Sequence, residues 1–217
     1  MNNFTRRAKK LLSTYGIGSG KKLTLMQAID YGVDLKRLHL GCGNIHIRGW
    51  CNVDVLKTGA TDLILDIQSL PGIKNNSIDN IYSCHVLEHF STNDIHRILA
   101  RWFDVLQPGG EIRISVPDLD KITNIFQENI NHFLTPGNQP WIALIYGGQK
   151  DQYDFHKTGF NFTYLKELLT KVGFFSIKEY GADAHFIDGI FDNSLAKEPF
   201  GKPISLNVVA SKPNQTN

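Results

Sequence analysis

The 217-residue chain has few of the features that mark secreted, metal-binding or membrane proteins. It has only 3 cysteines, Cys42, Cys51 and Cys84, which are odd in number and lack the paired spacing of a zinc site. We therefore expect reduced thiols and a cytoplasmic location. Apolar runs stay well below the roughly 18 residues that indicate a membrane span, and residues 1–4 lack the apolar centre of a signal peptide.

The chain also lacks a marked excess of either charge. It has 23 basic and 21 acidic residues, a net charge of +2, and a single short basic cluster at residues 6–10. We therefore expect neither nucleic acid nor an anionic membrane as its partner. A hydrophobic share of 41% over this length suits one soluble domain with a sizeable core.

Strand-like and helix-like segments alternate from residue 37 onward. We expect strands at 38–40, 50–55, 61–66, 78–84, 111–116, 174–180 and 204–211, and helices at 93–106, 121–133 and 163–172. Such alternation favours an α/β fold, with a Rossmann-like, mainly parallel sheet of seven strands and helices on both faces. The last two strands have an irregular connection, which favours an antiparallel last strand.

The main domain is expected over residues 36–212. Residues 1–35 form a predicted N-terminal helical extension, with short helices at 3–15 and 23–31. At the other end, residues 213–217 form a predicted disordered tail, to which Lys212 also belongs by composition. Residues 135–160 are rich in glycine, aromatic residues and amides without clear periodicity. A stretch of that kind indicates a substrate-binding or lid insertion.

A glycine turn, His39–Asn44, follows the first predicted strand. Gly41 and Gly43 allow positive φ and a close approach of backbone to a ligand. Asp54, Asp66 and His85 come at the ends of three further predicted strands. Because the carboxyl ends of parallel strands meet at one edge of a sheet, we expect a shared ligand site there.

These motifs, taken in order, resemble those of the class I S-adenosylmethionine-dependent methyltransferases, and most closely the small bacterial enzymes associated with polysaccharide biosynthesis. The resemblance covers residues 37–120 and is looser to the end of the chain. The matching stretches are His39–Gly43, Val53–Asp54, Asp66–Ile67, Ser83–His89, Leu106–Gly110 and Arg113–Asp118.

The resemblance implies S-adenosylmethionine as the cofactor, with the glycine turn at its methionyl end, Asp54 at the ribose hydroxyls, and Asp66 with the Ile67 amide at the adenine. The implied cofactor-binding residues are Leu40, Gly41, Cys42, Gly43, Asp54, Val55, Asp66, Ile67 and His85. It further implies methyl transfer to a small or carbohydrate-linked acceptor, by in-line attack on the sulfonium methyl and most simply at oxygen. Positioning and desolvation supply most of the catalysis in such a transfer.

The candidate catalytic residues are His85, His156 and Asp118. His85 would lie where cofactor and substrate meet, and His156 could act as a general base or be a locally bonded loop histidine. Asp118 could reach the substrate or cap the following helix. Asp66 could equally be a turn residue.

Two departures from the family pattern stand out. Asp54 lies only 13 residues after Gly41, so the first crossover is too short for the usual helix and is expected to be a tight loop. His46 occupies the third glycine position of a dinucleotide-binding turn, which argues against an NAD(P)-dependent oxidoreductase, the main alternative. A non-catalytic cofactor-binding module on the same fold is a further alternative.

His85–His89 also matches the H-x-x-E-H pattern of some zinc proteases. The motif follows a strand end, and no convincing further carboxylate ligand is evident downstream. We therefore expect no metal here, and expect Glu88 and His89 to cap and pack a helix.

Overall fold

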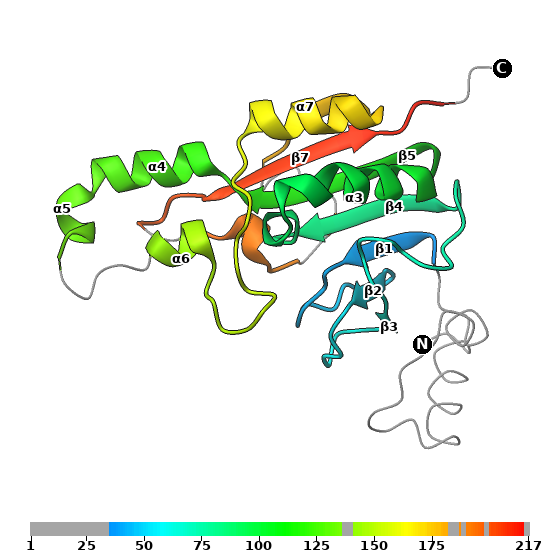
Figure 1. Ribbon diagram of the computed structural model, residues 1–217, viewed down its shortest axis with the longest axis horizontal. Helices are drawn as coiled ribbons and strands as arrows, with labels where there is room; N and C mark the ends of the chain where they lie inside the picture. The colour runs from blue at the N-terminus through cyan, green and yellow to red at the C-terminus, as the bar shows by residue number, and fades with distance from the viewer. Residues whose placement is uncertain (1–34, 136–140, 182–186, 188–189, 198–199, 215–217) are drawn as a thin grey trace.

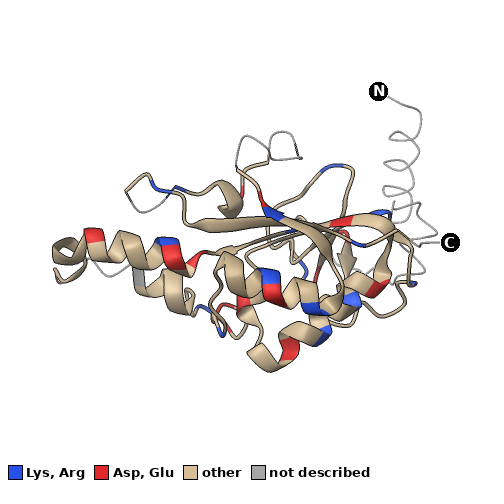
Figure 2. Ribbon diagram, turned by 90° about the horizontal axis from the view of Figure 1, so that it is seen from above, with Lys and Arg blue, Asp and Glu red and all other residues tan. Residues whose placement is uncertain are grey.

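The computed structural model describes residues 35–135, 141–181, 187, 190–197 and 200–214. The helices expected at 3–15 and 23–31 lie outside these residues. Among the described helices, none is long and apolar enough to cross a membrane. Figure 2 shows acidic and basic residues interspersed along the helices, in keeping with the small net charge of +2.

The centre of the fold is one sheet of seven strands in the order β3-β2-β1-β4-β5-β7-β6 (Figure 1). The strands are β1 (Arg37–Leu40), β2 (Cys51–Asp54), β3 (Leu63–Ile64), β4 (Ile78–Cys84), β5 (Leu106–Pro117), β6 (Phe175–Glu179) and β7 (Ser205–Ser211). β1 to β5 pair in parallel, and β7 runs antiparallel to both β5 and β6. This confirms the predicted seven-stranded, mainly parallel sheet with an antiparallel last strand.

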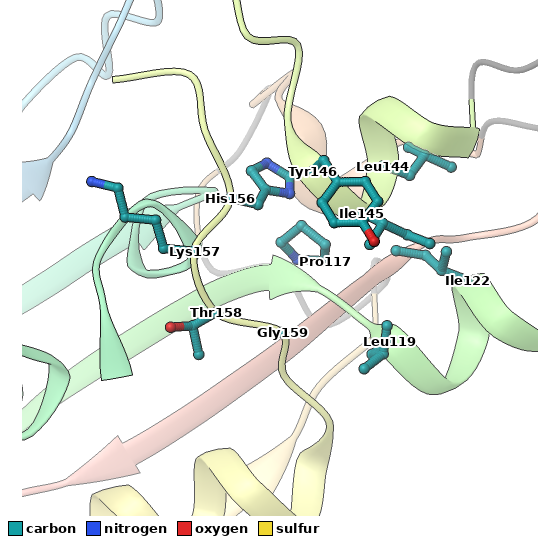
Figure 3. Close-up of a pocket in the computed structure, with 10 residues that line it drawn as sticks. All are labelled: Pro117, Leu119, Ile122, Leu144, Ile145, Tyr146, His156, Lys157, Thr158 and Gly159. Carbon is teal, nitrogen blue, oxygen red and sulfur yellow. The ribbon is translucent and has the colours of Figure 1, made fainter. Parts of the chain in front are cut away.

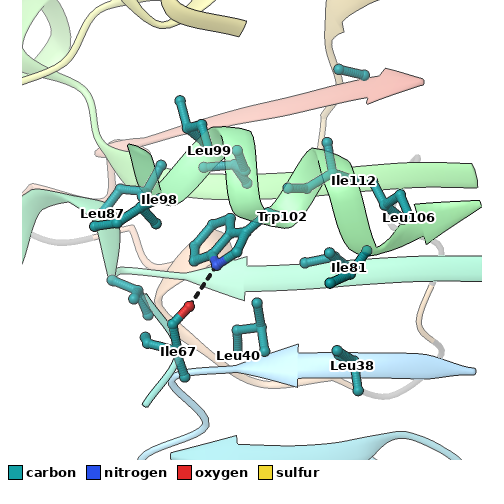
Figure 4. Packing of buried hydrophobic residues seen from close by; sticks show 14 of the residues in the cluster. Leu38, Leu40, Ile67, Ile81, Leu87, Ile98, Leu99, Trp102, Leu106 and Ile112 are labelled. Carbon is teal, nitrogen blue, oxygen red and sulfur yellow. Dashed lines mark hydrogen bonds between the residues drawn. The ribbon is translucent and has the colours of Figure 1, made fainter. Parts of the chain in front are cut away.

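The main core lies between the sheet and the helices α3 (Thr92–Val105) and α7 (Phe162–Val172). Alternate strand residues such as Leu38, Leu40 and Ile81 meet the apolar stripe of α3, of which Trp102 is fully buried (Figure 4). Asn161 caps the start of α7, and Gly173 ends that helix with φ +113°. These two helices contact each other and cover one face of the sheet. Helices were expected on both faces, and among the described residues they cover one.

The opposite face is more polar and is covered by loops. His39 is buried on it, and Tyr82 packs there with Ile47, Trp50 and Ile190, which come from the connections at 45–50 and 187–195. Two polar side chains of this face bond to the second of these connections, since the Tyr82 hydroxyl donates to Asp192 and Asn207 Nδ2 donates to the Ser194 carbonyl. Loops therefore do the covering that helices do on the first face.

The crossover between β1 and β2 has no helix, as expected, and Asn52 of β2 holds it in place. Asn52 is fully buried, and its Oδ1 accepts hydrogen bonds from the Ile47 amide at 2.8 Å and from His39 Nδ1 at 3.0 Å. Its Nδ2 donates to the carbonyls of Ile47 and Trp50 and to Asp62 Oδ2. The Asn52 side chain thus bonds to backbone groups of the crossover, which in a helix would bond to one another.

The connection from β3 to β4 is also free of helix, and Arg101 of α3 holds it. The guanidinium donates to the carbonyls of Ser69, Leu70 and Ile73 and to Asn75 Oδ1. Trp102 Nε1 donates to the Ile67 carbonyl at 2.7 Å (Figure 4). α3 therefore satisfies carbonyl groups of a connection that has no helix of its own.

Some boundaries differ from the prediction. The helix expected to run to 106 ends at Val105, and β5 begins at once, five residues before the predicted strand at 111. The helix expected at 121–133 is divided at Asn129 into α4 (Leu119–Glu128) and α5 (Ile130–Phe133), and the 135–160 stretch contains α6 (Trp141–Tyr146). A 3-10 turn, η1, spans Leu87–His89, and a second, η3, spans Asn193–Leu195.

Lys212 is not part of a disordered tail. Its Nζ donates to the Phe103 and Leu106 carbonyls, each at 2.8 Å, at the carboxyl end of α3. A cation at the negative end of a helix dipole stabilises that end, so this contact ties the segment after β7 to α3.

Candidate functional site

The glycine turn leaves β1 at Gly41 with φ +71° and continues through Gly43 with φ +52°. The Gly41 and Cys42 amides both donate to the Val53 carbonyl, at 2.8 and 3.1 Å. A Cβ on Gly41 would lie 2.3 Å from Val86 Cγ2, whereas a Cβ on Gly43 would meet no atom within 4 Å. Gly41 is therefore required by packing, while Gly43 faces open space as a ligand-binding turn should.

Asp54, at the end of β2, is fixed against this turn. Its Oδ2 accepts the Gly43 amide at 2.8 Å, and its Oδ1 accepts the Leu56 amide at 2.8 Å. Thr58 Oγ1 donates to the Gly43 carbonyl and links the loop after β2 to the same turn. The carboxylate is half-buried and keeps further lone pairs for a ligand.

A cavity of about 630 Å³ opens beside the turn. Gly41, Cys42, Gly43 and His85 line it, together with residues 191–193, 195 and 196. Its volume lies within the range usual for ligand pockets. The structure thus brings four of the predicted cofactor-binding residues together around one cavity.

Part of the lining of this cavity comes from a loop that was not predicted from the sequence, residues 191–196. Asp192 accepts the Tyr82 hydroxyl at 2.6 Å and the Ser194 amide at 2.9 Å, and Asn207 Nδ2 donates to the Ser194 carbonyl at 3.1 Å. Because Tyr82 and Asn207 belong to the sheet, these bonds fix the loop over the strand ends. Asp192 followed by Asn193-Ser194 is a local turn signal, but its partners lie far away in sequence.

Four other predicted cofactor residues, Leu40, Val55, Asp66 and Ile67, do not line this cavity. The side chains of Leu40 and Ile67 are buried in the core, and Val55 is exposed. Asp66 is exposed, and its carboxylate accepts the Gln68 amide at 3.0 Å and the Ser69 hydroxyl at 2.6 Å, which is the geometry of a turn residue. Its expected contact with adenine stays a prediction.

His85 follows β4 and also adopts a positive φ, +53°. Such strain in a residue other than glycine is typical of functional sites. Its Nε2 lies 2.9 Å from Ser205 Oγ, which in turn donates to the Asn193 carbonyl at 2.7 Å. The serine proton is therefore committed to Asn193, so His85 carries its own proton on Nε2 and presents the lone pair of Nδ1.

Burial, together with the nearby His156, lowers the pKa of His85 to about 4. The imidazole is therefore uncharged at neutral pH. Its Nδ1 lies 3.4 Å from Glu88 Oε1.

Glu88 is buried, with a relative exposure of 1%. Neither of its carboxylate oxygens has a hydrogen-bond partner among the described residues. Burial raises the pKa of this carboxyl to about 8. The side chain was expected to cap a helix. The capping prediction is wrong, because η1 has no side-chain cap, whereas the burial of Glu88 agrees with the expected packing. The carboxylate lies close to the imidazoles of His89 and His156.

The 155–158 segment is fastened onto η1. The Lys157 and Thr158 amides donate to the Glu88 carbonyl at 2.7 and 3.2 Å, and Thr158 Oγ1 donates to the Phe90 carbonyl at 2.8 Å. His156 is held by this docking with its ring 5.0 Å from that of His89. Burial lowers the pKa of His156, and the neighbouring His89 lowers it further.

A second cavity, of about 210 Å³, lies between this segment, α6 and the start of α4. Figure 3 shows His156 beside Tyr146 on its wall, with Leu144 and Ile122 giving it an apolar side and the Lys157 side chain pointing away. His156 is the predicted catalytic residue that borders this cavity. The predicted insertion at 135–160 therefore supplies several of its walls.

Asp118 is buried and caps α4. Its carboxylate accepts the amides of Asp120 and Lys121 and pairs with Lys121 Nζ at 2.9 Å. It lines neither of the two cavities described above. The cap accounts for this residue without a catalytic role.

The cavity thiol is not poised for nucleophilic chemistry. Burial raises the pKa of Cys42 to about 11, and its Sγ lies 3.7 Å from Thr61 Oγ1. Burial also raises the pKa of Cys84. Both are small packing residues at neutral pH.

Residues 14–114 match the sequence model of a family described as a methyltransferase domain. Within the described residues, this range contains β1 to β4, the glycine turn, Asp54 and His85. None of the curated proteins matches the chain.

Several solved structures share the fold. An S-adenosylmethionine-dependent methyltransferase from Archaeoglobus fulgidus has a TM-score of 0.51 and 18% identity, over 87% of this chain and 91% of that one. The 1,6-didemethyltoxoflavin-N1-methyltransferase of Burkholderia thailandensis, solved with S-adenosylhomocysteine, has a TM-score of 0.52 and 17% identity, over 98% and 79%. The chain spans only 34% of the CurJ carbon methyltransferase structure. That match covers 69% of the present chain, at 17% identity and a TM-score of 0.41.

The fold is therefore that of the S-adenosylmethionine-dependent methyltransferases, and the family match supports S-adenosylmethionine as the cofactor. The residues present fit that molecule. Gly43 faces open space, and the Asp54 carboxylate beside it retains acceptor capacity for hydroxyl groups.

Proposed function

We propose that this protein transfers a methyl group from S-adenosylmethionine to a hydroxyl of a small or carbohydrate-linked acceptor. The observation that carries the proposal is the glycine turn fixed by Asp54 beside the 630 Å³ cavity, with His85 on its wall. Gly41 and Gly43 would hold the methionyl end, and Asp54 the ribose. The bound cofactor supplies an already activated methyl group, so the protein has mainly to position an acceptor and exclude water.

The smaller cavity is the proposed acceptor site. Its apolar walls from α4 and α6 exclude water, and His156 offers a polar group at one side. The lowered pKa of His156 leaves the imidazole uncharged near neutral pH, which is the form that accepts a proton from a hydroxyl. His85 would act as a positioning residue at the cofactor side, since its Nε2 is committed to Ser205.

The carbohydrate-linked acceptor rests on the resemblance to enzymes of polysaccharide biosynthesis, and the transfer to oxygen rests on the chemistry of a hydroxyl beside a neutral imidazole. A cytoplasmic location, with neither nucleic acid nor membrane as the partner, belongs to the same proposal.

The cofactor part of the proposal is tested by calorimetric titration of the purified protein with S-adenosylhomocysteine and, separately, with NAD⁺. We expect saturable binding of the former and not of the latter, because His46 replaces the third glycine of a dinucleotide turn. Binding of NAD⁺ alone would favour an oxidoreductase.

The acceptor part is tested by incubating the protein and S-adenosylmethionine with a panel of monosaccharides and nucleotide-linked sugars, followed by mass spectrometry. A product heavier by one methyl group, lost in a His156→Ala variant, is the expected result. If the cofactor binds and a broad panel of hydroxyl, amine and carbon acceptors gives no product, the protein is a cofactor-binding module without transferase activity.

A further inference from the structure

We propose that Glu88, His89 and His156 form a binding site for a single divalent transition metal ion of the zinc class. One ligand atom of each residue lies within 4.8 Å of the others. Glu88 and His89 come from η1, and His156 comes from the segment docked on it. The fold thus brings together two imidazoles and one carboxylate, a ligand set found in catalytic zinc sites that keep one position open.

The burial of the Glu88 carboxylate favours a bound cation. A buried carboxylate without a hydrogen-bond partner is costly, and such groups in proteins are normally paired or bound to a metal. Both oxygens of Glu88 lack a hydrogen-bond partner among the described residues, although the backbone around the side chain is well bonded. A divalent cation between Glu88 and the two imidazoles would supply the missing partner.

The hydrogen bond of His89 orients its ring for metal binding. Its Nδ1 lies 3.2 Å from the Phe155 carbonyl, to which it can only donate. That bond places the proton on Nδ1 and leaves the lone pair on Nε2. Metal-binding histidines characteristically donate their other ring N–H to a carbonyl or carboxylate, which fixes the ring. His89 is prepared in this way by the residue next to His156.

The proposed metal site is accessible from the smaller cavity. His156 lines the 210 Å³ cavity, so an ion beside it lies at the edge of that cavity and its open position can face a bound molecule. If the proposed function holds, the metal would bind the acceptor hydroxyl and lower the pKa of that hydroxyl. In that state the His156 lone pair serves as a ligand, and the metal replaces the imidazole as the activating group. This catalytic role rests on the proposed function, whereas metal binding itself does not.

The charges around the site allow a cation. His85 Nδ1 presents a lone pair toward Glu88 at 3.4 Å, and Asp154 lies near both His89 and His156. Lys157 is the nearby positive group, and its side chain is exposed and points away from the cavity (Figure 3). The proposed ligands thus face one another and not a fixed cation.

The test is a zinc titration of the full chain after removal of metal with a chelator, using competition with a chromophoric indicator. We expect one tight site per chain, and with Co²⁺ in place of zinc an intense visible absorption typical of a four- or five-coordinate site. His89→Ala and His156→Ala should each weaken the affinity at least about tenfold. His96→Ala removes an exposed histidine on α3 and should leave the affinity unchanged.

Glu88→Gln keeps the shape of the side chain and removes the charge, so it should also weaken zinc binding. If that variant does not fold, the two histidine variants decide, with circular dichroism and thermal unfolding as checks of their structure. Absence of a tight site in the parent protein would overturn the proposal. So would tight binding that persists in both histidine variants. The S-adenosylhomocysteine titration is separate, and its failure would affect the proposed function and not the metal site.

Discussion

Asn52 provides the sharpest test of how the short first crossover is stabilised. We predict that Asn52→Ala destabilises the protein far more than a typical substitution of a polar residue. Its fully buried side chain bonds to four residues, Ile47, Trp50, His39 and Asp62, with the two N–H groups of Nδ2 shared among three acceptors. At a net value of about 1 kcal/mol each, and with buried partners left unpaired, the loss in free energy of unfolding should be about 3–5 kcal/mol.

The measurement is urea-induced unfolding followed by fluorescence and circular dichroism. Asp62→Ala offers a milder version, because it removes the two bonds between Asp62 and Asn52 and a partly exposed contact with His46 at 3.6 Å, and should cost about 1–2 kcal/mol. Asn75→Ala is the control, since Asn75 is exposed and accepts one bond from Arg101. The reasoning is refuted if Asn52→Ala costs less than about 1 kcal/mol or no more than the Asn75 control.

Three further predictions concern the turn, the second crossover and pH. Gly41→Ala should cost about 2–4 kcal/mol because its Cβ would meet Val86, whereas Gly43→Ala should cost only about 1–2 kcal/mol for its positive φ; equal costs in denaturant unfolding would contradict this. Arg101→Met should lower the free energy of unfolding by about 1–3 kcal/mol through loss of its bonds to the β3–β4 connection, and an unchanged midpoint would argue otherwise. Burial lowers the pKa of His39, so the contribution of the neutral imidazole to the free energy of unfolding is fully present above the unfolded pKa of about 6.5 and declines as the pH falls below it. In unfolding curves taken at falling pH, the His39→Asn variant should therefore lose less stability than the parent protein does.

Much of the sheet could be predicted because each strand carries its own signal. The apolar runs, the glycine turn and the acidic strand ends are local, and the seven strands occur close to the predicted ranges. The shortness of the first crossover was also visible from the spacing of Gly41 and Asp54. What replaces its helix was not, because Asn52 looks like an ordinary strand residue until the loop folds over it.

The same limit applies to the end of the chain. Lys212 follows a predicted strand and precedes a polar sequence, so composition suggests a tail. Its role comes from the carboxyl end of α3, more than a hundred residues earlier. A single lysine carries no local signal of that contact.

The candidate site divides in the same way. Gly41, Gly43 and Asp54 could be found because a glycine turn and a strand-end carboxylate are recognisable in one sequence. The cluster of Glu88 and His156 could not, since 68 residues separate them and the docking of 155–158 uses backbone amides that any sequence possesses. The H-x-x-E-H pattern contains Glu88 and His89, but no metal was expected there because no further ligand was evident downstream, and only the fold brings His156 to them.

The most direct test of the central claim is the affinity for S-adenosylhomocysteine of the parent protein and of Asp54→Ala, measured by calorimetry. The account predicts saturable binding to the parent protein and a loss of about 1.5–3 kcal/mol in the variant, the scale of hydrogen bonds to a charged group. Glu167→Ala, on the surface of α7, should bind like the parent protein. Failure of the parent protein to bind at millimolar ligand, or equal affinity of the parent and Asp54→Ala proteins, would contradict the account.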